Sequence, residues 1–289
     1  MTSPRVWFVT GASSGFGRVV VEHVLKKGDI AVATLRKPDM LSDLVEQYPS
    51  SRLLTLRLDV TDPAETTAAF NKAIETYGRI DVVFNNAGYC VISEAEGISE
   101  TSARGQFEVM FWGAANVTKE AVKCFRDINR PIGGRLLQMS SRSAFVGAVG
   151  VAHYGAAKAA LECLTEGWAA ELDPRWNIKI TLVEPALFRT PAPSKNFMEP
   201  PHPAYADPSL PSSKYRSLYP GVERIFTGDP AKLAQAMYRL SELEDPPFRL
   251  PLHKVALDTA RRKGESLIKA VDEYASWSDD IYLSDSTSS

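Results

Sequence analysis

The chain has 289 residues, of which 44% are hydrophobic and 24% charged, a composition typical of a globular protein with enough apolar residues for a large core. Its net charge is -2 with acids and bases well mixed, which argues against a nucleic-acid-binding protein and against binding to an anionic membrane surface. The three cysteines and four histidines are scattered, so the sequence predicts neither a disulfide framework nor a metal site.

No apolar run approaches the length that a helix needs to cross a bilayer. The chain also enters a strand-like run, VWFVT, within its first few residues, which leaves no room for a signal peptide. An odd number of separated cysteines is typical of a reducing compartment. We therefore expect a cytoplasmic protein without a nucleic-acid or membrane partner.

Short β-branched runs alternate with helical patterns from the N-terminus onward. The strand-like runs cover residues 6–10, 30–35, 53–58, 80–86, 135–140, 178–184 and 248–252. The helical patterns cover about residues 16–27, 41–48, 64–77, 101–127, 152–172, 230–242 and 255–277. Nearly continuous apolar strands joined by helices predict parallel pairing. The predicted fold class is α/β: a single doubly wound, Rossmann-like parallel sheet with helices on both faces, forming one domain over 1–289.

The stretch TGASSGFG, residues 10–17, separates the first strand from the first helix. Its three glycines allow a sharp turn and a close approach of the backbone to a ligand, and the helix that follows points free N–H groups at an anion. The spacing departs from Gly-x-Gly-x-x-Gly, and a structural turn is the alternative, but the position favours a dinucleotide site. The residues of this turn expected at the cofactor are Gly11, Ser13, Ser14, Gly15, Phe16 and Gly17.

The end of the second strand indicates which dinucleotide binds. An acidic residue there would accept hydrogen bonds from a ribose 2′-hydroxyl, but this chain has Arg36 and Lys37 instead. A guanidinium fork suits a 2′-phosphate, and the lysine adds charge. A solvated basic turn is the alternative; the chemistry favours NADP(H) over NAD(H).

Tyr154 and Lys158, in YGAAK, are four residues apart and share one face of a predicted helix. A nearby ammonium favours the phenolate and lowers the pKa of a tyrosine. A tyrosine tuned in this way can protonate a carbonyl oxygen as hydride reaches the carbon. Alone, the pair is equally compatible with a surface pair that has no function.

Residues 185–230 differ in composition from the rest of the chain, because they contain ten of its 19 prolines together with several aromatic residues. Proline-rich sequence forms neither a central strand nor a long helix. A long irregular segment in a compact protein is usually functional, so we expect a substrate loop or lid over 185–230. The polar end of the chain, 278–289, is expected to be a flexible tail.

In order along the chain, TGASSGFG, NNAG (85–88), a serine thirteen residues before the tyrosine, and YGAAK resemble the motifs of the short-chain dehydrogenase/reductase family. The resemblance covers nearly the whole chain. The C-terminal stretch, FRLPLHKVALDTARRKGESLIKAVDEYASW, further resembles an NADP-dependent branch that includes relatives of hydroxysteroid and retinol dehydrogenases. It implies an oxidoreductase that interconverts a ketone or aldehyde and its alcohol.

The family's roles, carried over, make Tyr154 the general acid/base, Lys158 the residue that tunes it and holds the nicotinamide ribose, and Ser141 the hydroxyl that steadies the substrate oxygen. Ser140 is one residue out of register for that role. The resemblance also implies cofactor contacts from Asp59, Val60, Asn86, Ala87, Gly88, Pro185, Leu187 and Thr190. Ala186 stands where family members usually have glycine. Pairing through the two long helices, into a homodimer or homotetramer, is a further expectation.

The substrate wall is expected to be apolar and aromatic, because no arginine clamp for a charged substrate is visible. Its candidates are Tyr89, Cys90, Ser143, Phe145, Val146 and Phe188, with Trp112 interpreted as a core residue instead. Such a wall suits a hydrophobic ketone or alcohol.

One position departs from the family pattern. Met110 stands where the resemblance implies an asparagine that holds a proton-relay water, and a thioether accepts hydrogen bonds weakly and donates none. One alternative is a relay through another water or a backbone group, and a second is that Ser141, Tyr154 and Lys158 suffice without it. The remaining alternative is a cofactor-bound protein with non-redox chemistry, such as an isomerase or cyclase, or a binding protein.

Overall fold

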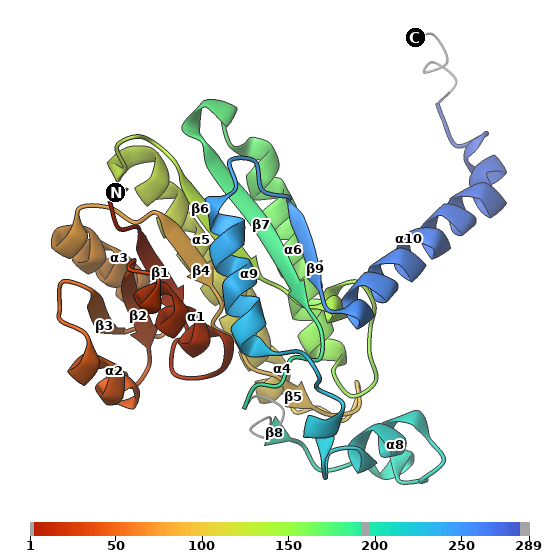
Figure 1. The fold of residues 1–289 in the computed structure, drawn as a ribbon. Coiled ribbons are helices and arrows are strands. Elements are labelled where there is room, and N and C mark those ends of the chain that lie inside the picture. Colours follow the sequence, from red (N-terminus) through yellow and green to blue (C-terminus); the bar gives the residue numbers. More distant parts are fainter. Residues whose placement is uncertain (1–2, 192–196, 284–289) are drawn as a thin grey trace.

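The computed structural model describes residues 3–191 and 197–283. Seven strands form one parallel sheet in the order β3-β2-β1-β4-β6-β7-β9 (Figure 1). The strands are β1 (Val6–Thr10), β2 (Ile30–Leu35), β3 (Leu53–Arg57), β4 (Val82–Asn85), β6 (Gly134–Met139), β7 (Ile178–Pro185) and β9 (Arg249–Leu252). Since all six strand pairings are parallel, the predicted doubly wound sheet is confirmed.

Helices cover both faces of this sheet. They are α1 (Gly15–Lys26), α2 (Ser42–Gln47), α3 (Pro63–Tyr77), α4 (Glu100–Phe107), α5 (Ala114–Lys123), α6 (Ala152–Glu171), α8 (Pro211–Ser217), α9 (Pro230–Glu242) and α10 (Lys254–Tyr274). Helix α3 shows why such segments begin and end where they do. Asp62 accepts hydrogen bonds from the N–H groups of Ala64 and Glu65, and Gly78 takes the left-handed conformation that ends the helix.

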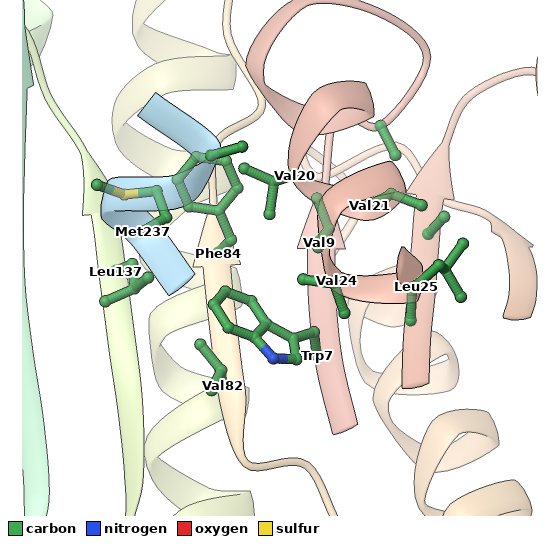
Figure 2. Packing of buried hydrophobic residues seen from close by; sticks show 14 of the residues in the cluster. Trp7, Val9, Val20, Val21, Val24, Leu25, Val82, Phe84, Leu137 and Met237 are labelled. Carbon is green, nitrogen blue, oxygen red and sulfur yellow. The ribbon is translucent and has the colours of Figure 1, made fainter. Parts of the chain in front are cut away.

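The core has two halves, one on each face of the sheet. On the first, α1 and α9 pack side chains such as Val24 and Met237 over Trp7 and Phe84 (Figure 2). On the second, α3 and α5 pack Phe70 and neighbouring apolar residues against the strands. Burying each large apolar side chain contributes about 1.5–3 kcal/mol to folding. This packing on both faces explains why the strands have no polar alternation.

The helix predicted over 101–127 is not regular. Two π-helical segments, Glu108–Gly113 and Cys124–Ile128, follow α4 and α5 respectively. A Cβ on Gly113 would lie 2.6 Å from Val60 Cγ2, so the first π segment packs closely on the loop after β3. Single π turns inside helices occur frequently at functional sites.

Within its described residues the proline-rich segment is irregular as expected, apart from α8, a two-residue strand and two 3-10 turns, Pro203–Tyr205 and Val222–Arg224. That strand, β8 (Phe197–Met198), pairs in parallel with β5 (Val91–Ile92), which follows the NNAG stretch. Sequence reasoning missed this small sheet, because two-residue strands carry no periodicity. Residues 192–196 of the segment lie outside the described residues.

After β9 the chain leaves the sheet through α10, which projects from the body of the protein (Figure 1). A 3-10 turn, Ala275–Ser278, follows it. Of the tail expected over 278–289, residues 284–289 lie outside the described residues. Within 3–191 and 197–283, no helix combines the length and apolar character needed to span a bilayer.

Candidate active site

A cavity of about 630 Å³ opens beyond the carboxyl ends of the sheet strands. In doubly wound sheets this edge is where ligands bind, at the point where the strand order reverses, here between β1 and β4. Most residues expected at the cofactor line this cavity, namely Gly11, Ser13, Ser14, Gly15, Phe16, Arg36, Asp59, Val60, Asn86, Ala87, Gly88, Tyr154, Lys158, Pro185, Leu187 and Thr190. Gly17 and Lys37 are not among the lining residues.

The glycine turn is shaped by close backbone packing. Gly11 and Gly15 have φ angles of +68° and +57°, in the left-handed region that favours glycine. A Cβ on Gly17 would lie 2.4 Å from the carbonyl oxygen of Gly11, so only glycine lets α1 start this close to β1. Ser14, at the N-cap of α1, makes no side-chain capping bond, and no acid lies in the first turn. The helix N-terminus thus meets the cavity with its positive end, which suits a phosphate.

The NNAG stretch is fastened to this turn by Thr10. Its Oγ1 accepts hydrogen bonds from the N–H groups of Asn86, at 2.8 Å, and Ala87, at 3.0 Å. Asn86 Nδ2 donates in return to the carbonyl oxygen of Thr10 at 2.9 Å. These three bonds hold β1 and β4 together at the switch point. Thr10 itself was not singled out from the sequence, because a threonine that ends a strand has no distinguishing spacing.

Arg36 directly follows β2 and lines the same cavity as Tyr154. It is exposed, lines the cavity, and has no hydrogen-bond or ion-pair partner within the described residues. Burial raises the pKa of Asp59, but hydrogen bonds from Thr61 and the charge of Arg36 outweigh it, so the pKa is lowered overall. Asp59 is therefore ionised, held by Thr61 at 2.8 Å, and Arg36 keeps its fork available for an anion.

The segment after β7 crosses the cavity beside the glycine turn. Leu187 has a positive φ of 49°, and its carbonyl accepts a hydrogen bond from Gly228 N at 2.9 Å. Phe188 stacks edge-on against Phe16 of the glycine turn, with 5.5 Å between ring centroids. A Cβ on Gly15 would lie 3.7 Å from Thr190 Cβ, so the two segments nearly touch. The glycine turn and the segment after β7, both expected to contact the cofactor, thus form adjoining walls of the cavity.

Tyr154, in the first turn of α6, and Ser141, at the end of β6, line one part of the cavity. Burial, reinforced by Cys90, raises the pKa of Tyr154 to about 12, while Ser141 and Arg142 act in the opposite direction. This differs from the lowered value expected from the lysine, because removal from water outweighs the neighbouring charges. The phenol consequently keeps its proton at neutral pH.

Lys158 is 3% exposed, and its Nζ donates a hydrogen bond to the carbonyl oxygen of Met139 at 2.7 Å. Burial lowers the pKa of this amine to about 8, and Glu162, one turn further along α6, limits the shift. Tyr154 and Lys158 are therefore on one helical face, as the spacing predicts, with the amine fixed on the end of β6.

Behind the lysine, Arg249 from β9 joins three acids from α6 and β7. It bonds to Glu162 at 2.7 Å and also pairs with Glu166 and Glu184. Ser140 hydrogen bonds to Glu162, away from the tyrosine. Burial, together with the charge of Glu162, raises the pKa of Glu184 to about 7. The sequence did not predict this cluster, because its members are up to 87 residues apart and none belongs to a recognisable motif.

Met110 is fully buried and lines the cavity from the first π segment. A Cβ on Gly88 would lie 3.3 Å from Met110 Cγ, so the thioether packs on the NNAG stretch. A methionine here supplies apolar surface where a hydrogen-bonding side chain would hold water.

The expected substrate wall is present in part. Tyr89, Cys90, Ser143 and Phe188 line the cavity, whereas Phe145 and Val146 do not. Burial raises the pKa of the Cys90 thiol to about 12, so it stays protonated and does not act as a nucleophile. Trp112, interpreted from the sequence as a core residue, is instead 55% exposed.

Residues of the proline-rich segment line another part of the cavity. They include Tyr215, Leu218, Tyr219, Val222, Ile225 and Phe226. The ring of Tyr215 packs on Gly150, whose Cβ would otherwise lie 2.5 Å from it. Among the described residues, Arg36, Arg142 and Lys158 are the lysines and arginines that line the cavity.

The chain belongs to the short-chain dehydrogenase family, whose model matches residues 5–200. It is 35% identical over 260 residues to an uncharacterized oxidoreductase, C162.03, of Schizosaccharomyces pombe, covering 90% of this chain and 85% of that protein. A short-chain dehydrogenase from Streptomyces avermitilis has a similar structure, with a TM-score of 0.85, 34% identity, and coverage of 97% and 99% of the two chains. One from Burkholderia phymatum, solved in complex with NAD, shares the fold at 21% identity, a TM-score of 0.77 and coverage of 92% and 95%. The protein is thus an oxidoreductase of this family, as the motifs predicted.

Proposed function

We propose that the protein is an NADPH-dependent reductase that converts a hydrophobic ketone or aldehyde to its alcohol, reversibly in principle. The observation that carries this proposal is that one cavity is lined by the glycine turn, by Arg36, and by Ser141, Tyr154 and Lys158. This cavity therefore combines a phosphate-binding turn, a guanidinium left unpaired by the described residues and a proton donor. NADPH, when bound, supplies the hydride.

The residues present fit this cofactor. The turn made by Gly11 and Gly17 leaves no room for a side chain between β1 and α1, so backbone N–H groups can approach a pyrophosphate. The exposed fork of Arg36, without an acid beside it at the end of β2, favours a 2′-phosphate over a 2′-hydroxyl. A distant structural relative was solved with NAD, so the choice rests on Arg36 rather than on the fold.

The chain's own residues handle the substrate oxygen and its proton. Ser141 steadies the carbonyl oxygen, and Tyr154, which holds its proton because its pKa is about 12, donates it to that oxygen as hydride arrives at the carbon. The resulting phenolate lies on the helical face of Lys158, whose ammonium stabilises it. A proton from Lys158, replaced from solvent, restores the phenol. A protonated tyrosine favours the reductive direction at neutral pH.

The substrate class follows from the wall of the cavity. Tyr89, Tyr215, Val222 and Phe226 offer apolar and aromatic surface, and the volume of about 630 Å³ must also admit the cofactor. Pockets of this kind bind hydrophobic ligands with few polar anchors. We therefore assign residues 185–230, within one domain, to holding the substrate's apolar body.

The test mixes protein, NADPH or NADH, and a panel of hydrophobic ketones and aldehydes, and follows the loss of reduced-nicotinamide absorbance. Activity with NADPH that Tyr154→Phe abolishes is the expected result, since that variant removes only the proton donor. Binding of NADPH to Tyr154→Phe, measured by protein fluorescence, serves as the control that the variant folds. Full activity of Tyr154→Phe would exclude the mechanism.

Met110 supports a second candidate, a cofactor-bound enzyme with non-redox chemistry such as isomerisation or cyclisation. A fully buried thioether in the cavity wall cannot donate a hydrogen bond to a relay water. Product formation without net consumption of NADPH would favour this candidate. Met110→Asn separates the two: a large gain in reductase turnover indicates that the natural protein has given up redox chemistry.

We also propose that the protein is cytoplasmic and forms a homodimer or homotetramer. Cys90, Cys124 and Cys163 are unpaired, which supports a reducing, cytoplasmic environment. Exposed Trp112, on the long helical region after α4, supports pairing through the two long helices.

A further inference from the structure

The outer half of α10 carries a row of large apolar side chains that the described residues leave uncovered. Leu267 is 55% exposed, Ile268 64% and Val271 67%, with Tyr274 and Trp277 exposed as well. Figure 1 shows this part of the helix projecting from the body, and only its first turns approach β9. Scattered exposed apolar residues are normal, but a contiguous row along one helix marks an interaction surface.

The spacing of this row indicates that its partner is another helix. Apolar or small residues recur at alternating steps of three and four, at Leu257, Ala260, Gly264, Leu267, Val271 and Tyr274. This is the heptad repeat by which two helices interlock their side chains. A flat surface or a globular groove would not require so regular a seam. The row runs from Leu257 to Tyr274, about two and a half heptads or roughly 27 Å of helix.

The charges along α10 indicate what that helix is and how it runs. Residues 254–264 carry four basic side chains and one acidic, a net charge of +3. Residues 265–283 carry one basic and five acidic, a net charge of -4. An antiparallel copy of the same helix sets each basic half beside an acidic half, whereas a parallel copy sets like charges together.

We propose that α10 pairs antiparallel with α10 of a second copy of this chain, with Leu267, Ile268 and Val271 at the centre of the contact. The interface is separate from the long helical region and α6, so it adds to any pairing made there. About two and a half heptads give an interface at the small end of the size range, so association depends on concentration. A lipid surface fits less well, because residues 254–283 have a net charge of -1, which an anionic membrane does not attract.

The first experiment compares masses by sedimentation velocity of the full chain over a range of concentrations. Leu267→Glu places a charge in the seam, while its neighbour Ser266→Glu makes the same charge change on the opposite face of the helix. We expect the wild type and Ser266→Glu to form an assembly of twice the mass of Leu267→Glu. Equal masses for all three proteins overturn the proposal.

The second experiment tests direction, in a background in which the exposed Cys163 is serine. Ile268→Cys lies near the crossing point of an antiparallel pair, so a short bismaleimide linker should join two chains through it. Lys254→Cys then lies about 40 Å from its own copy and should not crosslink. Crosslinking at both positions indicates a parallel pair and overturns the proposal. So does flotation with phosphatidylcholine–phosphatidylserine vesicles that Leu267→Glu abolishes while the mass in solution stays unchanged.

Discussion

Glu94 and Arg216, 122 residues apart, form a two-point ion pair that fixes the proline-rich segment to the loop after β5. Arg216 Nε lies 2.7 Å from Glu94 Oε1, and its Nη2 lies 2.6 Å from Oε2. The Glu94 side chain is only 2% exposed, and Arg216 holds the pKa of this carboxyl at about 2. Because Tyr215 and Leu218, which flank Arg216 in the sequence, line the cavity, the pair positions this part of the cavity wall.

Replacement Arg216→Met should loosen this wall. Glu94 would remain buried without its partner, a change that costs about 3–5 kcal/mol in buried pairs. We expect the KM for a large ketone to rise about tenfold or more, a lower Tm, and little change in NADPH affinity. Arg104→Met is the matched control, because its ion pair with Glu100 is exposed on one helix and is worth about 0.5 kcal/mol or less. Equal effects of the two variants would contradict the role of the pair.

Arg36→Ala should shift the cofactor preference. A hydrogen bond to a charged group is worth about 1.5–3 kcal/mol, so the ratio of kcat/KM for NADPH to that for NADH should fall about 10- to 100-fold. Lys37→Ala removes the neighbouring positive charge, but Lys37 does not line the cavity, and its effect should be smaller. The measurement is the pair of kcat/KM values for each variant. A larger effect at Lys37 would reverse the assignment.

The pH dependence of reduction should follow Lys158 rather than Tyr154. Since the lysine's pKa is lowered to about 8, its ammonium loses charge as pH rises through that value, while Tyr154 stays protonated up to about 12. We therefore expect kcat/KM for reduction to fall above about pH 8. In Lys158→Arg the guanidinium stays charged, so the fall should move to higher pH even if the rate is lower. A decline at unchanged pH in this variant would assign it to another group.

Glu184 should make the protein less stable as pH rises. Its pKa is raised to about 7 by burial and by Glu162, so the folded state holds a proton that the unfolded chain has lost. The free energy of unfolding should thus decrease between about pH 5 and 7, and the cost should be fully present above 7. At pH 8, Glu184→Gln should raise Tm, by roughly 2–4 °C for each kcal/mol gained in the free energy of unfolding. At pH 5 the same substitution should not raise Tm.

Glu166→Gln provides the comparison for that measurement. Glu166 contacts the same guanidinium, but its side chain is 52% exposed. Its replacement should leave the pH dependence of Tm nearly unchanged. If both variants responded alike, the effect would belong to the charge of Arg249 rather than to the burial of Glu184.

The sheet and the cofactor end of the cavity could be predicted from the sequence because local signals determine them. The three glycines of the first turn, the NNAG stretch and the four-residue spacing of Tyr154 and Lys158 are each contiguous along the chain. Their positions at strand ends follow from parallel pairing alone. Phe145 and Val146 do not line the cavity although Ser143, in the same turn, does, and spacing along the chain cannot predict which residues of a turn face a cavity.

Other features depend on burial and on distant partners. The pKa of Tyr154 rises rather than falls because removal from water exceeds the effect of a neighbouring charge, and a sequence does not report how deeply a phenol is buried. The pair of Glu94 and Arg216 joins two segments with no shared motif. The π segment at Met110 likewise leaves no mark on the helical periodicity of its neighbours.

Arg249 has a consequence for how the protein folds. It lies on β9, an edge strand of the sheet, and neutralises acids on α6 and β7, which precede it in the chain. Until β9 pairs with β7, Glu162 and Glu184 lack this guanidinium, and the charge of Glu162 opposes ionisation of Glu184. Addition of the edge strand therefore supplies the counter-ion that lets α6 and β7 keep their acids side by side.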